Sequence, residues 1–162
     1  MDLARAAPDR SRAQSTERGL RGGEGLRRIQ INKELNEENK PEDDATKIEV
    51  TTKHQIDNNA PQTMWIWEGL RLIGAGHKVP KGIFVEVKAC DTEKVTLDND
   101  LTLTHAQVCQ SLRLSYAITY ASCQGLTLPG RVRLETQSGF LTTRHLYVGV
   151  SRGTASEQVE VV

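Results

Sequence analysis

The sequence has few cysteines and no excess of charge of either sign. Its 162 residues include three cysteines, Cys90, Cys109 and Cys123, which are scattered and lack C-x-x-C spacing. An odd and scattered set argues against a disulfide scaffold or a zinc site, and indicates a reducing compartment. Lysine plus arginine and aspartate plus glutamate number 21 each. This balance indicates no polyanionic partner by itself, although a neutral protein can carry a local basic groove.

Long apolar stretches are also missing. No segment approaches the run of about 18 apolar residues that a membrane helix requires. The first residues, Met-Asp-Leu-Ala-Arg-Ala-Ala-Pro, contain no apolar signal core. We therefore expect a soluble, intracellular protein without a membrane partner. The length suits one domain, or a small domain that carries an insertion.

The chain lacks a phosphate-binding loop of the form G-x-x-x-x-G-K-[ST]. Gly69 and Gly74 have the glycine spacing, but Ala-Gly follows where Lys and Ser or Thr are required. The acidic runs Glu42–Asp44 and Asp98–Asp100 belong to turn-like sequence and do not follow an apolar strand. Neither run is a magnesium-binding motif, and no metal site is expected. The chain alone is therefore not expected to hydrolyse a nucleoside triphosphate.

Composition divides the chain into four segments. Residues 1–25 are rich in Arg, Ala, Ser and Gly, and a disordered basic tail is expected there because little apolar surface is available for burial. Residues 26–60 begin with apolar side chains at helical spacing, and an alternating strand is expected at Ile48–Thr51. Residues 64–104 predict a compact run of short strands, typical of a small barrel or meander. Residues 105–162 form the fourth segment.

Local patterns place the expected elements within these segments. Thr104-His105-Ala106-Gln107 has the form of a helix N-cap and first turn, and strand character returns at Leu114–Thr119. Trp65 and Trp67 alternate around Ile66, which predicts a packing role on one side of a strand over a base-stacking role. Further strands are expected at Leu70–Ile73, Ile83–Val87, Val95–Leu97, Leu101–Leu103, Arg131–Leu134 and Gln158–Val162.

Two stretches near the C-terminus carry the functional signal. In Tyr116–Leu128, an apolar, β-prone run ends in a small polar loop that contains Gln124 and Gly125. In Thr143–Thr154, a predicted helix delivers Ser151 and Arg152 at its C-terminal end, where Gly153 is expected to stop it. A polar loop after a strand, facing an arginine at a helix end, is how α/β domains build the nucleotide side of a cleft.

These stretches resemble motifs V and VI of superfamily 1B DNA helicases of the RecD/Pif-like branch, A-I-T-x-H-K-S-Q-G-L-T and L-Y-V-A-L-S-R. The segment Arg27–Asn36 is similar to the R-x-x-I-N-x-x-L-N helix that opens the second motor domain in this branch. The resemblance implies an α/β fold of the P-loop NTPase class, a partial RecA-like second motor domain (2A, UvrD-like C-terminal). Residues 26–60 and 105–162 would form that domain, and residues 64–104 a small SH3-like β-barrel insert (2B-like).

The resemblance also implies roles for single residues. Arg152 matches the arginine finger of motif VI, and Gln124, Gly125 and Thr127 match the ATP side of motif V. Thr119 and Ser122 match positions that contact single-stranded DNA. The sequence departs from the family where Ala-Ser replaces the usual His-Lys at positions 121 and 122, which removes ring and charge contacts to DNA.

A substitution in the same loop places Cys123 where the family has Ser. The local sequence supplies neither a His nor a carboxylate as a paired base, so a catalytic thiol is not expected there.

We therefore expect a fragment or truncated homologue of an ATP-dependent DNA helicase. ATP and Mg²⁺ would be needed only in a complete helicase, with a P-loop-containing domain or subunit acting in trans. Single-stranded DNA is the partner that the family implies, and the nucleus is the compartment if the source is a eukaryote. Two alternatives remain: a non-catalytic nucleic-acid- or protein-binding module derived from a helicase, and a product that folds poorly.

Overall fold

The computed structural model describes residues 27–50, 60–128, 130–136 and 141–162. The tail expected over residues 1–25 lies outside the described residues. A helix covers residues 27–39, as the apolar spacing predicts. The other elements, in chain order, are β1 (Thr46–Ile48), β2 (Met64–Ile66), β3 (Arg71–Gly74), β4 (Phe84–Cys90), β5 (Lys94–Leu97), β6 (Thr102–Thr104), α2 (His105–Ser111), β7 (Leu112–Leu114), β8 (Val132–Leu134), α3 (Thr143–Val150), the 3₁₀ turn η1 (Ser156–Gln158) and β9 (Val159–Val161).

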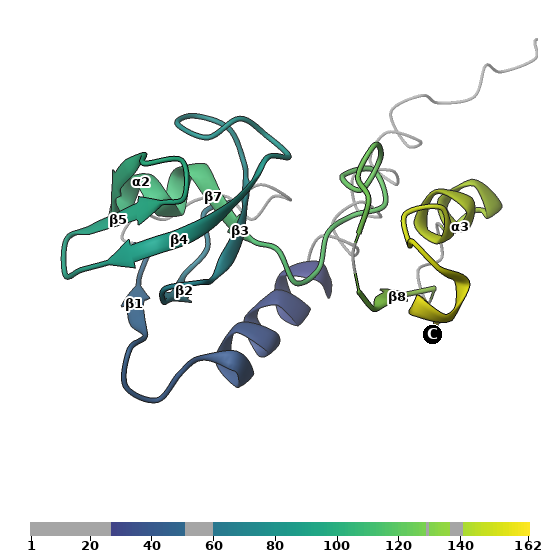
Figure 1. Ribbon diagram of the computed structural model, residues 1–162, viewed down its shortest axis with the longest axis horizontal. Coiled ribbons are helices and arrows are strands. Elements are labelled where there is room, and N and C mark those ends of the chain that lie inside the picture. The colour runs from purple at the N-terminus through teal and green to yellow at the C-terminus, as the bar shows by residue number, and fades with distance from the viewer. Residues whose placement is uncertain (1–26, 51–59, 129, 137–140) are drawn as a thin grey trace, which may run out of the picture.

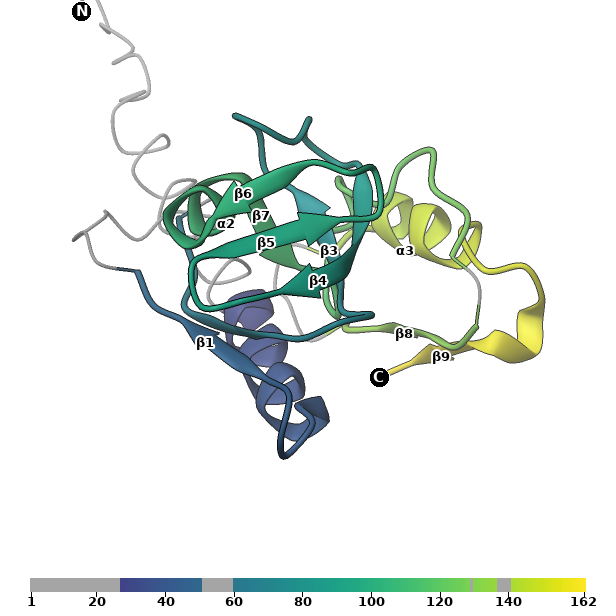
Figure 2. The same ribbon diagram turned by 60° about the vertical axis from the view of Figure 1, so that its left-hand side comes forward.

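Most strands belong to one curled antiparallel sheet with the order β6-β5-β4-β3-β7. Strands β1 and β2 form a separate antiparallel pair beside it, with Thr46 opposite Ile66 and Ile48 opposite Met64 (Figures 1 and 2). The register between β4 and β5 shifts between Val87 and Ala89, and such bulges bend and twist a strand. The chain is therefore a mixed α/β structure with a curled antiparallel sheet.

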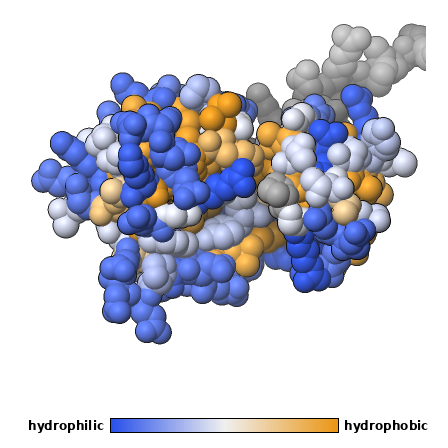
Figure 3. Space-filling model, viewed as in Figure 1, coloured by the Kyte–Doolittle hydropathy of each residue, from blue (hydrophilic) through white to orange (hydrophobic). Residues whose placement is uncertain are grey.

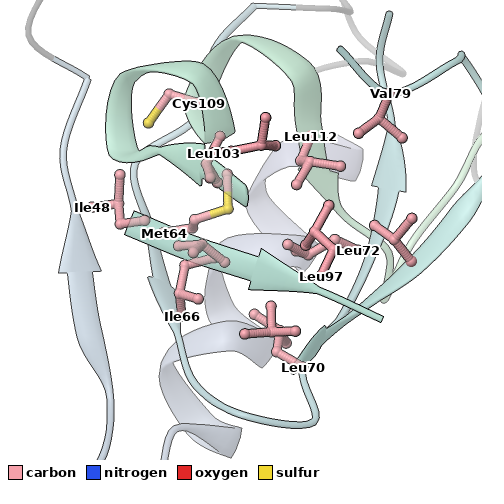
Figure 4. Packing of buried hydrophobic residues seen from close by; sticks show 14 of the residues in the cluster. Ile48, Met64, Ile66, Leu70, Leu72, Val79, Leu97, Leu103, Cys109 and Leu112 are labelled. Atoms are coloured by element: carbon pink, nitrogen blue, oxygen red, sulfur yellow. The ribbon is translucent and has the colours of Figure 1, made fainter. Parts of the chain in front are cut away.

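The core lies between the curled sheet and the β1–β2 pair (Figure 4). The alternation of side chains along β5 determines which of them enter the core: Val95 and Leu97 are buried, while Lys94 is exposed. The cluster also takes side chains from before residue 64 and after residue 104, namely Ile48 and Leu112. The largest fully buried side chains are Ile48, Met64, Ile66, Leu72, Leu97, Leu103, Leu112, Leu114, Val79, Val87, Val95 and Val108.

Helix α2 begins at the predicted cap. The Thr104 hydroxyl accepts from the Gln107 N–H, and the Gln107 side chain accepts from the Thr104 N–H at 3.0 Å, which completes a capping box. At the other end, the buried Arg113 guanidinium donates to the carbonyls of Cys109 at 2.7 Å and Leu112 at 2.6 Å. A cation on carbonyls at a helix C-terminus is favoured by the helix dipole.

The helix of residues 27–39 is fixed to two distant segments by two buried asparagines. Asn36 donates to the Trp65 carbonyl at 3.0 Å and accepts from the Trp65 N–H at 2.8 Å. One turn earlier, Asn32 donates to the Ala117 carbonyl at 2.9 Å and accepts from the Ala117 N–H at 2.7 Å. Each side-chain amide thus bonds both the N–H and the carbonyl of one residue, as the backbone of a neighbouring strand would. This helix links β2 to the segment that follows β7.

Both tryptophans are half-buried. The half-buried Trp67 packs against the core cluster, which confirms its predicted packing role. The Trp65 indole N–H donates to Glu37 at 2.7 Å, and the Lys40 ammonium lies 4.4 Å from the Trp65 ring centroid. Trp65 therefore adds a side-chain contact to the backbone bonds that join the first helix to β2.

The C-terminal part contains the parallel pair β8–β9 with α3 packed against β8 (Figures 1 and 2). The predicted strands at Arg131–Leu134 and Gln158–Val162 are confirmed as β8 and β9, the second shortened by the 3₁₀ turn over Ser156–Gln158. An added Cβ on Gly149 would lie 2.7 Å from a Leu134 methyl carbon. The glycine thus allows α3 to approach β8 closely.

Two predicted strands have different bounds. The strand expected over Leu114–Thr119 is wrong, because β7 ends at Leu114, where its pairing with Leu72 of β3 ends. Residues 115–119 then form no strand, and a β-prone sequence without a pairing partner stays irregular. The strand expected over Ile48–Thr51 lies earlier, at Thr46–Ile48, where β2 supplies its partner, and Thr51 is outside the described residues.

Within the described ranges, no helix is long and apolar enough to cross a membrane.

Candidate functional site

Helix α3 carries the candidate arginine to the surface. The Thr142 hydroxyl caps its N-terminus, and His145 completes a capping box by accepting the Thr142 N–H at Nδ1, 3.2 Å away. The helix ends at Val150 with Ser151 as C-cap, so Arg152 lies just beyond the last turn, as predicted. The end comes before Gly153, which instead forms a bridge with Leu128 in the polar loop.

Arg152 is half-buried and is held by neutral oxygen atoms. Its Nη2 donates to Ser151 Oγ at 2.9 Å, and its Nη1 donates to the Leu126 carbonyl at 3.3 Å. The Leu128 N–H donates in turn to the Arg152 carbonyl at 2.9 Å. No carboxylate in the described part of the chain forms a salt bridge with Arg152.

Residues 120–125 of the polar loop form a series of turns. Thr119 and Ser122 lie at its start, where their hydroxyl oxygens are 2.8 Å apart and the Ser122 N–H reaches Thr119 Oγ1 at 3.2 Å. Gly125 has a φ of 78°, the left-handed region that glycine adopts without steric cost. Gln124, Gly125 and Thr127 are exposed.

The structure brings the predicted loop and the predicted arginine into contact. The connection runs through Leu126 and Leu128, whose backbone groups bond Arg152. The sequence did not indicate these two residues, since their side chains are apolar and only their backbone takes part. The side chains of Gln124 and Thr127 extend from the same loop into solvent and make no direct bond with Arg152 among the described contacts.

Cys123 is a buried residue of the polar loop. It is 5% exposed, and its thiol donates to the Tyr120 carbonyl at 3.0 Å. Burial raises the pKa of the Cys123 thiol, an effect that the nearby Arg152 charge only partly opposes. A thiol in this state is a poor nucleophile, because the thiolate is the reactive form.

The glycine spacing at Gly69 and Gly74 has a structural explanation. Gly69 occupies a turn with φ of 84°, and Gly74 is the last residue of β3. An added Cβ on Gly74 would lie 2.0 Å from the Pro80 carbonyl oxygen, so this position requires glycine for close backbone packing. No group of His, Cys, Asp and Glu within the described ranges is arranged to hold a metal ion.

No family model and no curated protein matches the sequence. Solved structures do match the fold. Bacteroides Pif1 bound to single-stranded DNA aligns with a TM-score of 0.56 and 17% identity, over 79% of this chain and 37% of that chain. A Pif1 helicase solved to explain unwinding of forked duplex DNA aligns with a TM-score of 0.55 and 20% identity, over 82% of this chain and 35% of the other.

Pif1 from Candida albicans gives a TM-score of 0.52 at 13% identity, over 85% of this chain and 42% of that chain. At such low identities the likeness concerns the fold. The chain spans well under half the length of each of these three helicases. Its described residues thus have the fold of part of a Pif1 helicase.

Proposed function

We propose that this chain supplies the C-terminal part of the second RecA-like motor domain of a Pif/RecD-like DNA helicase. The observation that carries the proposal is the contact between Arg152 and the loop of residues 119–128, made through Leu126 and Leu128. This contact brings together, on one surface, the two stretches that resemble motifs V and VI. The fold shared with Pif1 helicases supports this assignment.

Arg152 acts in this proposal as an arginine finger toward ATP bound by another domain. Its guanidinium bonds two neutral acceptors. One is the Ser151 hydroxyl at the end of α3, and the other is the Leu126 carbonyl in the polar loop. A γ-phosphate would offer an anionic acceptor in their place, so that both partners of the hydrogen bond would be charged. Such a finger stabilises the charge that develops during phosphoryl transfer.

Gln124, Gly125 and Thr127 form the ATP side of the loop. Their exposure leaves them accessible to a nucleotide, and the left-handed Gly125 gives the backbone room for close approach. The Gln124 amide supplies both a donor and an acceptor. ATP and Mg²⁺ themselves would be held by a P-loop-containing domain in trans, because the sequence has no G-x-x-x-x-G-K-[ST] loop.

Thr119 and Ser122 would face single-stranded DNA at the start of the loop. Their hydroxyls already bond each other, and neither carries charge. DNA contact at this loop is therefore expected to be weaker than in relatives that keep the His-Lys pair. Residues 64–104, which contain strands β2 to β6, would correspond to the SH3-like insert of the second motor domain.

A complementation assay tests the proposed function. The purified first motor domain of a Pif1 helicase, which carries the P-loop, is mixed with this chain, ATP, Mg²⁺ and single-stranded DNA. The chain alone should show no steady-state ATP hydrolysis. The mixture should show turnover, and Arg152→Ala should reduce it by about 10³-fold or more. Arg144→Ala on the exposed start of α3 is the matched control. Robust hydrolysis by the chain alone, or activation that survives Arg152→Ala, contradicts the proposal.

A second candidate function is a non-catalytic nucleic-acid-binding module. It is favoured by the half-buried Trp65, whose ring centroid has the Lys40 and Lys47 ammonium groups at 4.4 and 6.0 Å. Titration with oligonucleotides at low and raised salt, followed by tryptophan fluorescence, tests this function. Quenching with a steep salt dependence supports nucleic-acid binding. An unchanged signal points to a protein partner or to an inert helicase relic.

A further inference from the structure

Ser151 connects the end of helix α3 to the side chain of Arg152. Its backbone N–H donates to the Tyr147 carbonyl at 3.0 Å, and its hydroxyl donates to the Val148 carbonyl at 3.0 Å. The same hydroxyl oxygen accepts from Arg152 Nε at 3.3 Å and from Arg152 Nη2 at 2.9 Å. Because its proton is donated to Val148, the Ser151 hydroxyl acts only as an acceptor toward Arg152.

These bonds hold one edge of the Arg152 guanidinium. Nε and Nη2 lie on the same side of the planar group, so both can point at one oxygen atom. The third nitrogen, Nη1, donates to the Leu126 carbonyl at 3.3 Å. The Arg152 backbone is fixed as well, since its N–H donates to the Gly149 carbonyl at 3.1 Å and its carbonyl accepts from the Leu128 N–H at 2.9 Å. Ser151 is therefore the residue whose side chain orients the Nε–Nη2 edge.

The two side chains lie at a helix end that solvent reaches. Ser151 is exposed and Arg152 is half-buried. Figure 3 shows polar and apolar side chains together on the surface of the part that contains α3, at the right of the view. An arginine that no side chain holds would occupy several rotamers in such a place, and fixing one of them on binding costs conformational entropy. The bonds from Ser151 lower that cost, because they order the guanidinium before a ligand arrives.

We propose that Ser151 is a positioning residue, which orients the guanidinium of Arg152 toward the phosphate of a nucleotide. This inference rests on the proposed function and deepens it. The guanidinium has five N–H groups and the described bonds use three, so a phosphate oxygen can meet it before any of these bonds breaks. A held arginine places its charge where phosphoryl transfer needs it, and a displacement of about 1 Å in such a group costs on the order of 100-fold in rate.

The orientation is tested first in the full chain alone, because the measurement then does not depend on ATP hydrolysis. NMR of protein that contains ¹⁵N-labelled arginine measures how fast the Arg152 Nε–H exchanges with water. Ser151→Ala removes the acceptor and should speed this exchange about tenfold or more. Ser151→Thr keeps a hydroxyl and should stay within about threefold of wild type. Ser156→Ala is the matched control, since Ser156 is an exposed serine whose hydroxyl bonds Glu157, and it should have no effect.

The effect on the reaction is measured in the complementation assay with the first motor domain. Ser151→Ala should lower kcat about tenfold or more and change the KM for ATP less than about threefold, because the P-loop domain binds the nucleotide. Ser151→Thr should restore most of the rate. In protein that already carries Arg152→Ala, Ser151→Ala should have almost no further effect, since Ser151 acts through Arg152. A serine that only stabilised α3 would lower the rate in both backgrounds.

Three results would overturn the positioning role of Ser151. The first is an Arg152 Nε–H exchange rate that Ser151→Ala leaves unchanged. The second is a kcat that rises in Ser151→Ala, because the hydroxyl would then compete with the nucleotide for Arg152. The third is an equal effect of Ser151→Ala with and without Arg152. A wild-type mixture without turnover contradicts the proposed function instead, and the exchange rate then still decides whether Ser151 orients Arg152.

Discussion

Asn32 and Ala117 exchange two hydrogen bonds although 85 positions separate them in the sequence. The Asn32 side chain is fully buried, and its amide satisfies both backbone groups of Ala117. Ala117 follows the last strand of the curled sheet and precedes the polar loop that contacts Arg152. The first helix therefore fixes the point where the chain passes from the curled sheet to the candidate site.

Replacing Asn32 by Ala should lower the free energy of unfolding by about 1–3 kcal/mol, because the N–H and carbonyl of Ala117 lose their partners in a partly buried position. Denaturant unfolding followed by circular dichroism measures this change. Gln30→Ala is the matched control, since Gln30 is exposed on the same helix and bonds only Glu34 in the same turn. A loss no larger than in Gln30→Ala would contradict the structural role of Asn32.

Ile48 and Leu112 should contribute to one cooperative unit. They lie on either side of residues 64–104 in the sequence, yet both belong to the same core cluster and are at most 1% exposed. Ile48→Ala and Leu112→Ala should each cost about 2–5 kcal/mol in a single unfolding transition. Val161→Ala, at a position that is 57% exposed, is the control. Two separate transitions would show that residues 64–104 fold independently.

Local signals in the sequence predicted much of the fold. The helix N-cap at Thr104, the first helix and the alternating strands β4 to β6 all depend on residues close in sequence. The strand expected at Leu114–Thr119 failed because strand formation needs a partner, and the pairing of β7 with β3 ends at Leu114. Propensity alone does not specify where a partner ends.

The candidate site was predictable in its side chains but not in its contacts. Arg152 and the loop with Gln124 and Gly125 were identified from motif resemblance. The bonds from the backbone of Leu126 and Leu128 to Arg152 carry no side-chain signal in the sequence. The buried Arg113 was missed for a related reason, since an arginine normally indicates an exposed position unless buried carbonyls are known to surround it.

The turn between β4 and β5 should make stability depend on pH through Asp91. Its carboxylate accepts from the backbone N–H groups of Glu93 at 2.8 Å and Lys94 at 2.7 Å, and these bonds lower the pKa of Asp91. A group with a lowered pKa in the folded state contributes stability above its unfolded pKa. That contribution is lost as the pH falls through the lower, folded value.

Comparing wild type with Asp91→Asn isolates this effect, because Asn keeps an accepting oxygen but has no charge. The difference in the free energy of unfolding should be largest at neutral pH and should shrink as the pH falls below the ordinary aspartate value of 3.8. Denaturant titrations between pH 7 and pH 2.5 measure it. A difference that stays constant over this range would exclude a charged role for Asp91.

The three free cysteines should react with iodoacetamide at different rates. Burial raises the pKa of Cys90, Cys109 and Cys123, but Cys90 is half-buried while Cys109 and Cys123 are 4% and 5% exposed. Cys90 should therefore be modified first, because reaction requires both thiolate and access. Mass spectrometry of peptides after timed alkylation measures the order. Faster modification of Cys123 than of Cys90 would show that the polar loop opens in solution.

Arg152→Gln should leave the fold almost unchanged, with a loss in the free energy of unfolding below about 1 kcal/mol. Its guanidinium is half-exposed and bonds only neutral atoms, so each bond contributes modestly. The backbone bond from Leu128 to its carbonyl does not involve the side chain. Leu134→Ala, which removes a buried contact with Gly149, should cost about 2–5 kcal/mol in the same assay. If Arg152→Gln were as destabilising as Leu134→Ala, the arginine would be a structural residue. If the Arg152→Gln protein is stable, a loss of ATP hydrolysis in the complementation assay is not caused by unfolding. The loss would then be due to the missing charge that Arg152 offers to the nucleotide.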